Sequence, residues 1–295
     1  MSIKHPIIAV TGSSGAGTST VKNSFDHIFR REKITPAVIE GDSMHKYDRT
    51  EMKKVITDAE AKNAEHLPTH FGPENNLLPE LAEIFRAYGE TGRGKRRFYL
   101  HNEQEAAPYG QQPGTFTPWE EFPEHTDLLF YEGLHGAYVG DEADVVQHAD
   151  LAIGVVPVVN LEWIQKIHRD TEGRGYSVEA VTHTILRRMH DYVNHICPQF
   201  SRTHINFQRV PIVDTSNPFI SRDIPTLDES LVVIRFRDYH GIDFPYLLNM
   251  IHDSFMSRPN CIVVPGGKMG LSMELVLSPI ILDMMEKKWK RSSSK

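Results

Sequence analysis

A glycine-rich segment near the start of the chain has the composition of a phosphate-binding loop. An apolar run at residues 7–10 leads into glycines at positions 12, 15 and 17, and a helical pattern follows from residue 20. Glycines let consecutive backbone N–H groups point into one cavity, and the N-terminus of the next helix adds its positive dipole. We therefore expect nucleotide phosphates to bind at Gly12, Ser13, Ser14, Gly15, Ala16, Gly17, Thr18, Ser19 and Thr20.

Two positions of this loop bear directly on its chemistry. Ser19 stands where such loops place the hydroxyl that binds Mg²⁺. Thr18 stands where most of them place a lysine that contacts the β- and γ-phosphates. The missing positive charge must come from another part of the chain, or the loop is not catalytic.

An acid and three basic residues follow the next apolar run, at residues 37–40. Asp42 lies just past the end of this run, at the sheet edge where α/β proteins bind ligands, so it is placed to act as a general base. His45, Arg49 and Lys53 recur every four residues and would share one face of a helix, which suits a phosphate group. The alternative is that Asp42 caps a helix and the basic residues form a solvated face, and the pattern alone favours neither.

Two more groups complete the set of chemical candidates. Glu132 ends the apolar run at residues 128–131, where phosphate-loop folds hold Mg²⁺, although helix N-caps also use such acids. Lys166, Arg169 and Arg174 surround a predicted helix end with glycines beyond it. Cations there either stabilise the helix C-terminus or belong to a lid that closes over a transferring phosphoryl group, supplying the charge that the loop lacks.

These side chains need a scaffold, and the apolar runs predict one. Continuous runs, typical of buried parallel strands, occupy residues 7–10, 37–40, 128–131, 151–158, 210–213, 231–236 and 262–264. Helical patterns at residues 20–30, 79–88, 161–170 and 178–196 separate many of them. This alternation predicts an α/β fold of three layers, with a mostly parallel (mixed) central sheet flanked by helices.

We expect residues 1–295 to form one domain. Residues 89–126 and 197–226 interrupt the alternation of strands and helices, and we predict that they are irregular loops over the active site. The basic, Ser-rich residues 287–295 are expected to be a short solvated tail.

Composition argues against several classes of function. The net charge of −7 disfavours nucleic acid as a partner, because phosphate backbones bind to basic surfaces. No apolar run approaches the roughly 18 residues of a membrane span, and residues 7–10 are too short for a signal peptide, so we expect a cytoplasmic protein. The histidines form no His-Glu-x-x-His motif, so a zinc site is not expected.

Taken in order, these motifs resemble those of the bacterial type in the P-loop phosphoribulokinase/uridine kinase family. The resemblance covers nearly the whole chain, and its main stretches are residues 10–19, 40–45, 130–136, 155–170 and 213–219. It implies a kinase that uses ATP and Mg²⁺ to phosphorylate the 1-hydroxyl of D-ribulose 5-phosphate, a Calvin cycle reaction that yields ribulose 1,5-bisphosphate and ADP. A threonine at position 18 is normal for this bacterial type.

The resemblance also implies a role for each candidate residue. Asp42 would be the general base, Ser19 and Glu132 would hold the metal, and Lys166 and Arg169 would stabilise the transferring phosphoryl group. The residues implied for the sugar phosphate are His45, Arg49, Lys53, Tyr99, His101 and Arg174.

Regulation and assembly follow from the same resemblance. The bacterial type is a homo-octamer activated by NADH and inhibited by AMP, which implies that Arg31, Arg235 and Arg258 are effector residues near a subunit interface. A reading of these three as plain surface arginines is equally compatible with the sequence. Two other functions stay open, a kinase of the same fold acting on uridine or another sugar phosphate, and a non-catalytic nucleotide-binding regulator.

Overall fold

The structure is a computed structural model that describes residues 4–13, 18–173, 175–221 and 223–292, without the side chains of residues 18, 19, 291 and 292. The expected site residues Ser14, Gly15, Ala16, Gly17 and Arg174 therefore lie outside the described residues, as do the side chains of Thr18 and Ser19.

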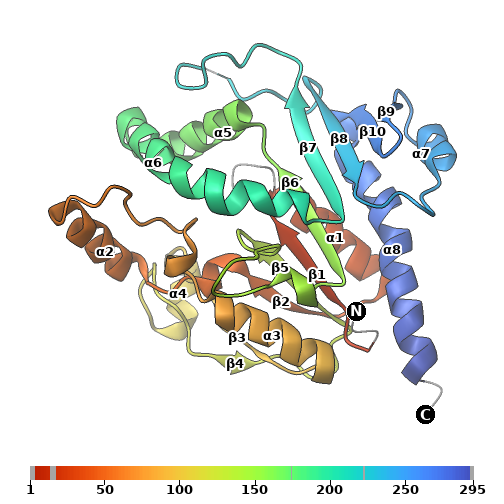
Figure 1. Cartoon of the computed structure of the whole chain (residues 1–295), viewed down its shortest axis with the longest axis horizontal. Helices are drawn as coiled ribbons and strands as arrows, with labels where there is room; N and C mark the ends of the chain where they lie inside the picture. The colour runs from red at the N-terminus through yellow and green to blue at the C-terminus, as the bar shows by residue number, and fades with distance from the viewer. Residues whose placement is uncertain (1–3, 14–17, 174, 222, 293–295) are drawn as a thin grey trace.

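An eight-stranded mixed sheet forms the centre of the molecule (Figure 1). Five strands run parallel, in the order β2 (Pro36–Glu40), β5 (Leu128–Gly133), β1 (Ile7–Thr11), β6 (Leu151–Val156) and β7 (Ile205–Pro211). The sheet continues with antiparallel neighbours β8 (Ser230–Phe236), β10 (Cys261–Pro265) and β9 (Phe255–Arg258). The carboxyl ends of β1, β2 and β5 therefore meet at one edge.

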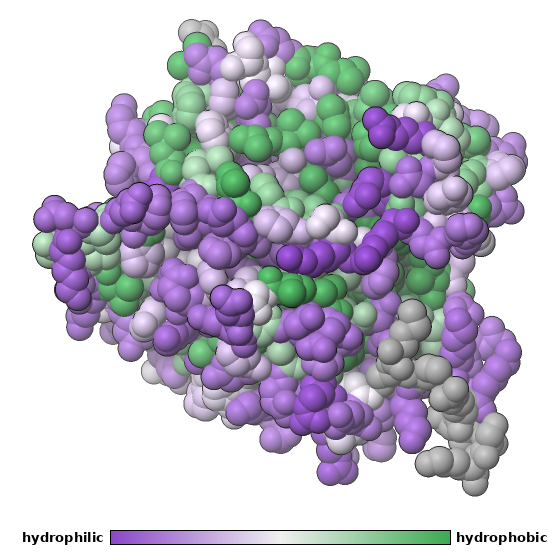
Figure 2. Space-filling view, in the orientation of Figure 1, coloured by the Kyte–Doolittle hydropathy of each residue, from purple (hydrophilic) through white to green (hydrophobic). Residues whose placement is uncertain are grey.

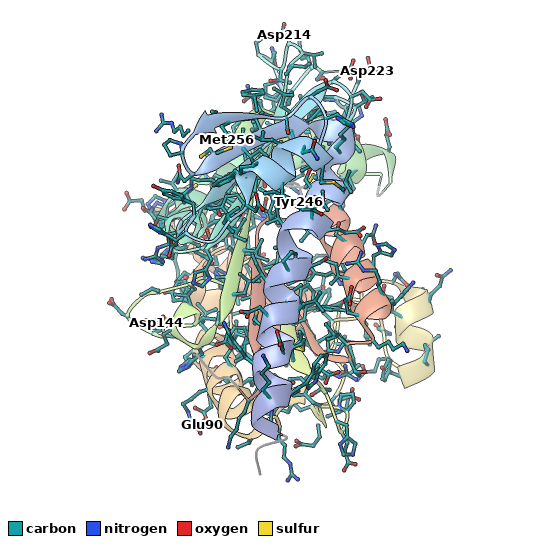
Figure 3. All side chains as sticks on the ribbon, turned by 90° about the vertical axis from the view of Figure 1, so that its right-hand side faces the viewer. Glu90, Asp144, Asp214, Asp223, Tyr246 and Met256 are labelled. Carbon is teal, nitrogen blue, oxygen red and sulfur yellow. The ribbon has the colours of Figure 1, made fainter. Side chains whose placement is uncertain are left out.

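Alternating side chains of the strands build two cores, one on each face of the sheet. Ile8 and Val10 point toward α1 (Thr18–Glu32) and α8 (Met269–Ser292), whereas Ile7 and Ala9 point toward α3 (Leu78–Thr91). The helix α7 (Phe244–Met250) joins the first of these cores, and α8 runs along the side of the molecule (Figure 3). The expected three-layer α/β fold is confirmed.

Two more helices pack on each other beyond the edge where the parallel strands end. The helices α5 (Val159–Glu172) and α6 (Val178–Asp191) share an apolar contact of Ile167 with Val181 and Ile185. The expected helix at residues 178–196 changes character after Asp191, where a π-helical turn covers Tyr192–Ile196.

The segment that carries Asp42 is a short turn rather than a helix. A 3₁₀ turn spans Gly41–Met44, and α2 (Arg49–Ala61) begins after Asp48. Asp48 caps α2 by accepting from the backbone N–H groups of Thr50 and Glu51, at 2.7 and 2.8 Å. The alternative that Asp42 caps the helix is therefore wrong.

Residues 95–121 form a hairpin that folds back over this turn. Its base pairs β3 (Lys95–Arg96) with β4 (Glu120–Glu121), and backbone hydrogen bonds join Thr117 to Phe98 and Leu100 to Thr115. Its tip carries the short helix α4 (Glu103–Ala106). We call this segment the 95–121 hairpin below.

Two sequence expectations need correction. The strand expected at residues 210–213 is β7 at Ile205–Pro211, so the expected loop 197–226 contains a strand of the central sheet. The prediction missed its start because Asn206, Gln208 and Arg209 interrupt the apolar run, while Ile205 and Phe207 alone enter the core. At the C-terminus, α8 extends to Ser292, so most of the expected tail is helical.

None of the helices in the described part of the chain combines the length and the apolar character needed to cross a bilayer.

Candidate active site

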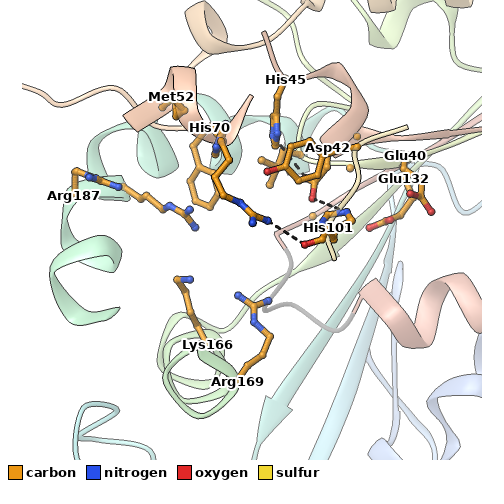
Figure 4. Close-up of a pocket in the computed structure, with 18 of the residues that line it drawn as sticks. Glu40, Asp42, His45, Met52, His70, His101, Glu132, Lys166, Arg169 and Arg187 are labelled. Carbon is orange, nitrogen blue, oxygen red and sulfur yellow. Dashed lines mark hydrogen bonds and ion pairs between the residues drawn. The ribbon is translucent and has the colours of Figure 1, made fainter. Parts of the chain in front are cut away.

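An open cavity of about 830 Å³ lies at the edge where β1, β2 and β5 end. Figure 4 shows Asp42, His45 and His101 on one side of it, with Lys166 and Arg169 of α5 on the other. Among the described residues, none between 197 and 226 lines this cavity, so of the two segments expected to cover the site only residues 89–126 do so, through Tyr99 and His101.

The described start of the phosphate loop is fixed to its neighbours. The Gly12 N–H donates to the Gly133 carbonyl at 3.1 Å, and the Thr11 hydroxyl bonds the Leu134 carbonyl and the buried Gln199 side chain at 3.0 Å each. The Ser13 hydroxyl donates to the buried carboxyl of Glu162 on α5. The loop therefore begins at a rigid junction, and Gly12 lines the cavity while Thr20 lies in the first turn of α1.

Asp42 projects into the cavity between two imidazoles. Its Oδ1 lies 3.7 Å from Nε2 of His45, and its Oδ2 lies 3.7 Å from Nε2 of His101. The Asp42 side chain is 48% exposed, so substrate can reach it. Among the described residues no lysine or arginine pairs with this carboxylate, and a carboxylate that faces a substrate cavity in this way is suited to accept a proton.

His45 contributes a neutral ring rather than a positive charge. It is 6% exposed and stacks on His70 with ring centroids 4.0 Å apart. Burial is the main cause that lowers the pKa of His45 to about 3, with the charges of His135 and Arg188 adding to it, and burial likewise lowers the pKa of His70 to about 3. At neutral pH His45 can bind a substrate by hydrogen bonds alone.

Arg49 and Lys53 lie on the first turns of α2, and their side chains line the cavity. Tyr99 and His101 of the 95–121 hairpin line it as well. The Arg49 guanidinium donates to the His101 carbonyl at 3.1 Å, and its backbone N–H donates to the Gly114 carbonyl at 2.9 Å. The structure thus brings together Asp42 and five of the six expected sugar-phosphate residues; the sixth, Arg174, is not described.

Lys166 and Arg169 reach the cavity from the opposite wall (Figure 4). Both side chains bind Asp170. Lys166 Nζ lies 2.5 Å from Asp170 Oδ2, and Arg169 Nε lies 2.9 Å from Asp170 Oδ1. Burial is the largest cause that lowers the pKa of Lys166 to about 8, followed by the charge of Arg188. The Lys166 ammonium is therefore sensitive to pH near neutrality.

The acids at the strand ends offer a place for Mg²⁺. Glu132 pairs in register with Glu40, and both line the cavity. Lys22 of α1 binds Glu40, Nζ to Oε1 at 2.7 Å, which offsets one of the two charges. Because Mg²⁺ keeps several waters and takes only one or two protein carboxylates beside substrate phosphates, Glu132 fits as its ligand.

Comparison with known proteins agrees with this geometry. Residues 7–216 match the Phosphoribulokinase / Uridine kinase family. The chain belongs to this family. It is 65% identical to the chromosomal phosphoribulokinase of Cupriavidus necator over 98% of both chains, and 62% identical to that of Nitrobacter vulgaris over 97% of this chain and 98% of the relative.

A solved structure extends the likeness to three dimensions. The phosphoribulokinase from Rhodobacter spheroides superposes with a TM-score of 0.89 and 57% identity, over 97% of this chain and 99% of that one. This chain therefore has the fold of a P-loop kinase along nearly its full length.

Two arginines that line the cavity were not expected from the sequence. Arg187 and Arg188 of α6 line the cavity, and burial is the main cause that lowers the pKa of Arg188 to about 10. An Arg-Arg pair in a predicted helix is an ordinary surface feature, and only the packing of α6 on α5 turns it inward. The stacked His70 was missed for a similar reason, since it lies in a segment without a recognisable motif.

The expected effector arginines lie away from the cavity. Arg31 connects α1 to α8 by donating to Glu274 at 2.8 Å and Ser278 at 2.7 Å. Arg235 and Arg258 flank the same residue, Cys261, on neighbouring strands of the sheet.

Proposed function

We propose that this kinase transfers the γ-phosphate of ATP to the 1-hydroxyl of D-ribulose 5-phosphate, giving ribulose 1,5-bisphosphate and ADP. The 65% identity to the Cupriavidus necator phosphoribulokinase along nearly the full length of both chains carries this proposal. The cavity supports it, because a carboxylate and a set of cations face each other across space for two phosphorylated substrates.

Asp42 acts as the general base in this proposal. As the sugar hydroxyl oxygen attacks the γ-phosphorus, its proton passes to the Asp42 carboxylate. The new O–P bond forms while the bond from the γ-phosphorus to the bridging oxygen breaks, and ADP leaves with that electron pair. His45 and His101 lie on either side of Asp42, each with its Nε2 atom 3.7 Å from a carboxyl oxygen.

The phosphate of the acceptor binds on the α2 side of the cavity. Arg49 and Lys53 supply positive charge there, with Tyr99 and His101 as hydrogen-bonding partners and Arg187 on α6 facing them. His45 serves as a neutral hydrogen-bonding ring, and we assign Arg174 to the same acceptor.

ATP binds to the phosphate loop, residues 12–20, and the N-terminus of α1 adds its positive dipole for the phosphates. Ser19 and Glu132 would hold Mg²⁺, which supplies neutralisation of the β- and γ-phosphates when bound. Lys166 and Arg169 stabilise the charge on the transferring group from across the cavity, taking the place of the loop lysine that is Thr18 here.

The acceptor is tested with a panel of labelled transfer reactions. Purified protein receives γ-labelled ATP with ribulose 5-phosphate, uridine or fructose 6-phosphate, and label in the product is measured. We expect ribulose 5-phosphate to give the highest kcat/KM of the three, at least about 100-fold above uridine, because basic groups that bind a phosphate lose their partner when the acceptor has none. Preference for uridine would identify another kinase of the fold, and no transfer to any acceptor would favour a regulator.

Regulation and assembly complete the proposal. NADH activates and AMP inhibits through Arg31, Arg235 and Arg258, and the protein works in the cytoplasm as a homo-oligomer, an octamer by resemblance. Large apolar residues that are more than half exposed on α6, on the π-helical turn that follows it and after β7 support an interface between copies (Figure 2). They are Leu186, Val193, Ile212 and Ile220. Light scattering on the intact protein tests the assembly, and NADH titration of the three arginine variants tests the regulation.

A further inference from the structure

Arg97 ends the basic run at residues 93–97, for which the proposed mechanism has no use. Its side chain is partly buried at the base of the 95–121 hairpin, and burial lowers the pKa of its guanidinium from the usual value. In the described part of the chain its hydrogen-bond partners are backbone carbonyls, not a carboxylate. Removing a cation from water costs free energy, so the position of Arg97 calls for a structural or functional explanation.

The carbonyls that Arg97 binds belong to the turn that carries the proposed base. Its Nε donates to the Ser43 carbonyl at 2.8 Å, and one Nη donates to the His45 carbonyl at 2.6 Å. Ser43 is the residue after Asp42, and His45 is the residue whose ring lies beside it. The two bonds therefore fix the backbone on both sides of Met44, just after the base.

Two aromatic rings of the same hairpin fix the other end of this contact. The Arg97 guanidinium lies 3.8 Å from the ring centre of Phe116 and 5.0 Å from that of Trp119. A planar guanidinium can stack over a ring face while its N–H groups donate two hydrogen bonds in the plane, a geometry that the compact ammonium group does not provide. Arginine is thus suited to connect the hairpin to the turn.

We propose that Arg97 is a positioning residue for phosphoryl transfer. It connects the turn that carries Asp42 and His45 to the hairpin that carries Tyr99 and His101. The connection keeps the position of the base fixed relative to the acceptor site. The inference rests on the proposed general-base role of Asp42. Without Arg97 the fold persists, but the distance between the base and the acceptor hydroxyl is no longer fixed.

The neighbouring arginine provides a matched control. Arg96 is the preceding residue and ends β3. Its guanidinium pairs with Glu120 at 2.9 Å and lies over Phe98, without a contact to the turn in the described residues. Replacing Arg96 with methionine removes the same charge from the same hairpin and leaves the contact with Ser43 and His45 intact.

The test compares Arg97→Met, Arg97→Lys and Arg96→Met in the full-length protein. A misplacement of about 1 Å can cost on the order of 100-fold in rate, so we expect Arg97→Met to lower kcat by about 10- to 100-fold and to raise KM for the acceptor. KM for ATP and ATP affinity in the binary complex should stay within about twofold, because the phosphate loop is not touched. Arg97→Lys should fall between Arg97→Met and the parent, and Arg96→Met should match the parent.

Several results would overturn the proposal. These are a folded Arg97→Met with a kcat within about threefold of the parent, an equal loss in Arg96→Met, or a loss of ATP affinity in step with kcat. If thermal unfolding shows that Arg97→Met does not fold, the test depends on Arg97→Lys. A kcat of Arg97→Lys equal to that of the parent protein would then contradict the proposal. Failure of the proposed function is a different result, since the parent protein would then transfer no phosphate to ribulose 5-phosphate.

Discussion

The close approach of two glycines sets the position of the proposed base. Gly133 ends β5, and Gly41 opens the turn that carries Asp42. A Cβ added at Gly133 would lie 2.5 Å from the Gly41 Cα and 2.6 Å from the Tyr131 hydroxyl. Tyr131 is 1% exposed and packed in the core beneath α3, so the turn is the part that must move.

The size of the effect follows from these distances. Carbon atoms pack comfortably at about 3.5–4.0 Å, so Gly133→Ala must displace the turn by roughly 1 Å. Overpacking of this kind costs about 1–3 kcal/mol of unfolding free energy, or about 2–5 °C in Tm for a chain of this size. The same displacement moves the Asp42 carboxylate, and we expect kcat to fall on the order of 100-fold.

The assay follows transfer of label from γ-labelled ATP to the sugar, since a coupled assay that oxidises NADH would consume the proposed effector. The matched control is Gly270→Ala on α8, where an added Cβ meets no atom within 4 Å. That variant should keep full activity and gain up to about 1 kcal/mol of stability, because alanine favours helix over glycine. A Gly133→Ala protein with parental kcat and Tm would refute the reasoning.

Three further predictions follow from the site. Asp42→Asn should lower kcat by at least about 100-fold while ATP binding survives, and near-normal turnover by product assay would mean that Asp42 is not the base. Arg49→Ala or Lys53→Ala should raise KM for the sugar phosphate far more than KM for ATP in steady-state kinetics; equal effects would remove them from the acceptor site. The Lys166 pKa of about 8 predicts that kcat/KM is flat below pH 8 and falls as the ammonium loses its proton above it, a limb that Lys166→Arg should shift to higher pH.

The strands and the phosphate loop could be predicted because their signals are local. Residues 7–11, 36–40 and 128–133 are largely apolar runs, each with a glycine or an acid at its end or directly after it, and a buried parallel strand needs no more than that. The sequence motif also places Asp42 at the correct edge. The surroundings of Asp42 depend on the 95–121 hairpin. No periodicity in the sequence predicts that this hairpin folds back over the turn.

The helix α8 was missed although a signal was present. Met273, Leu277, Ile281 and Met285 are buried at intervals of four residues, the spacing of one helix face. Pro279 within this stretch argues against a helix, because proline removes a backbone hydrogen bond. Tertiary burial of that face against α1 and the sheet outweighs the local penalty.

The separation of charge from the phosphate loop has a mechanistic consequence. A lysine inside the loop contacts the phosphates in the ground state and in the transition state, so its loss weakens binding and catalysis together. Here Lys166 and Arg169 of α5 line the cavity across from Asp42, and Lys166 is held by Asp170 at 2.5 Å. Their charge can act fully only when both substrates fill the space between the walls. Nucleotide binding and phosphoryl transfer should therefore be separable by mutation, and Lys166→Met should lower kcat by about two to four orders of magnitude at nearly constant ATP affinity. Weakened ATP binding at unchanged kcat, measured by stopped-flow and steady-state rates on one preparation, would place Lys166 on the nucleotide instead.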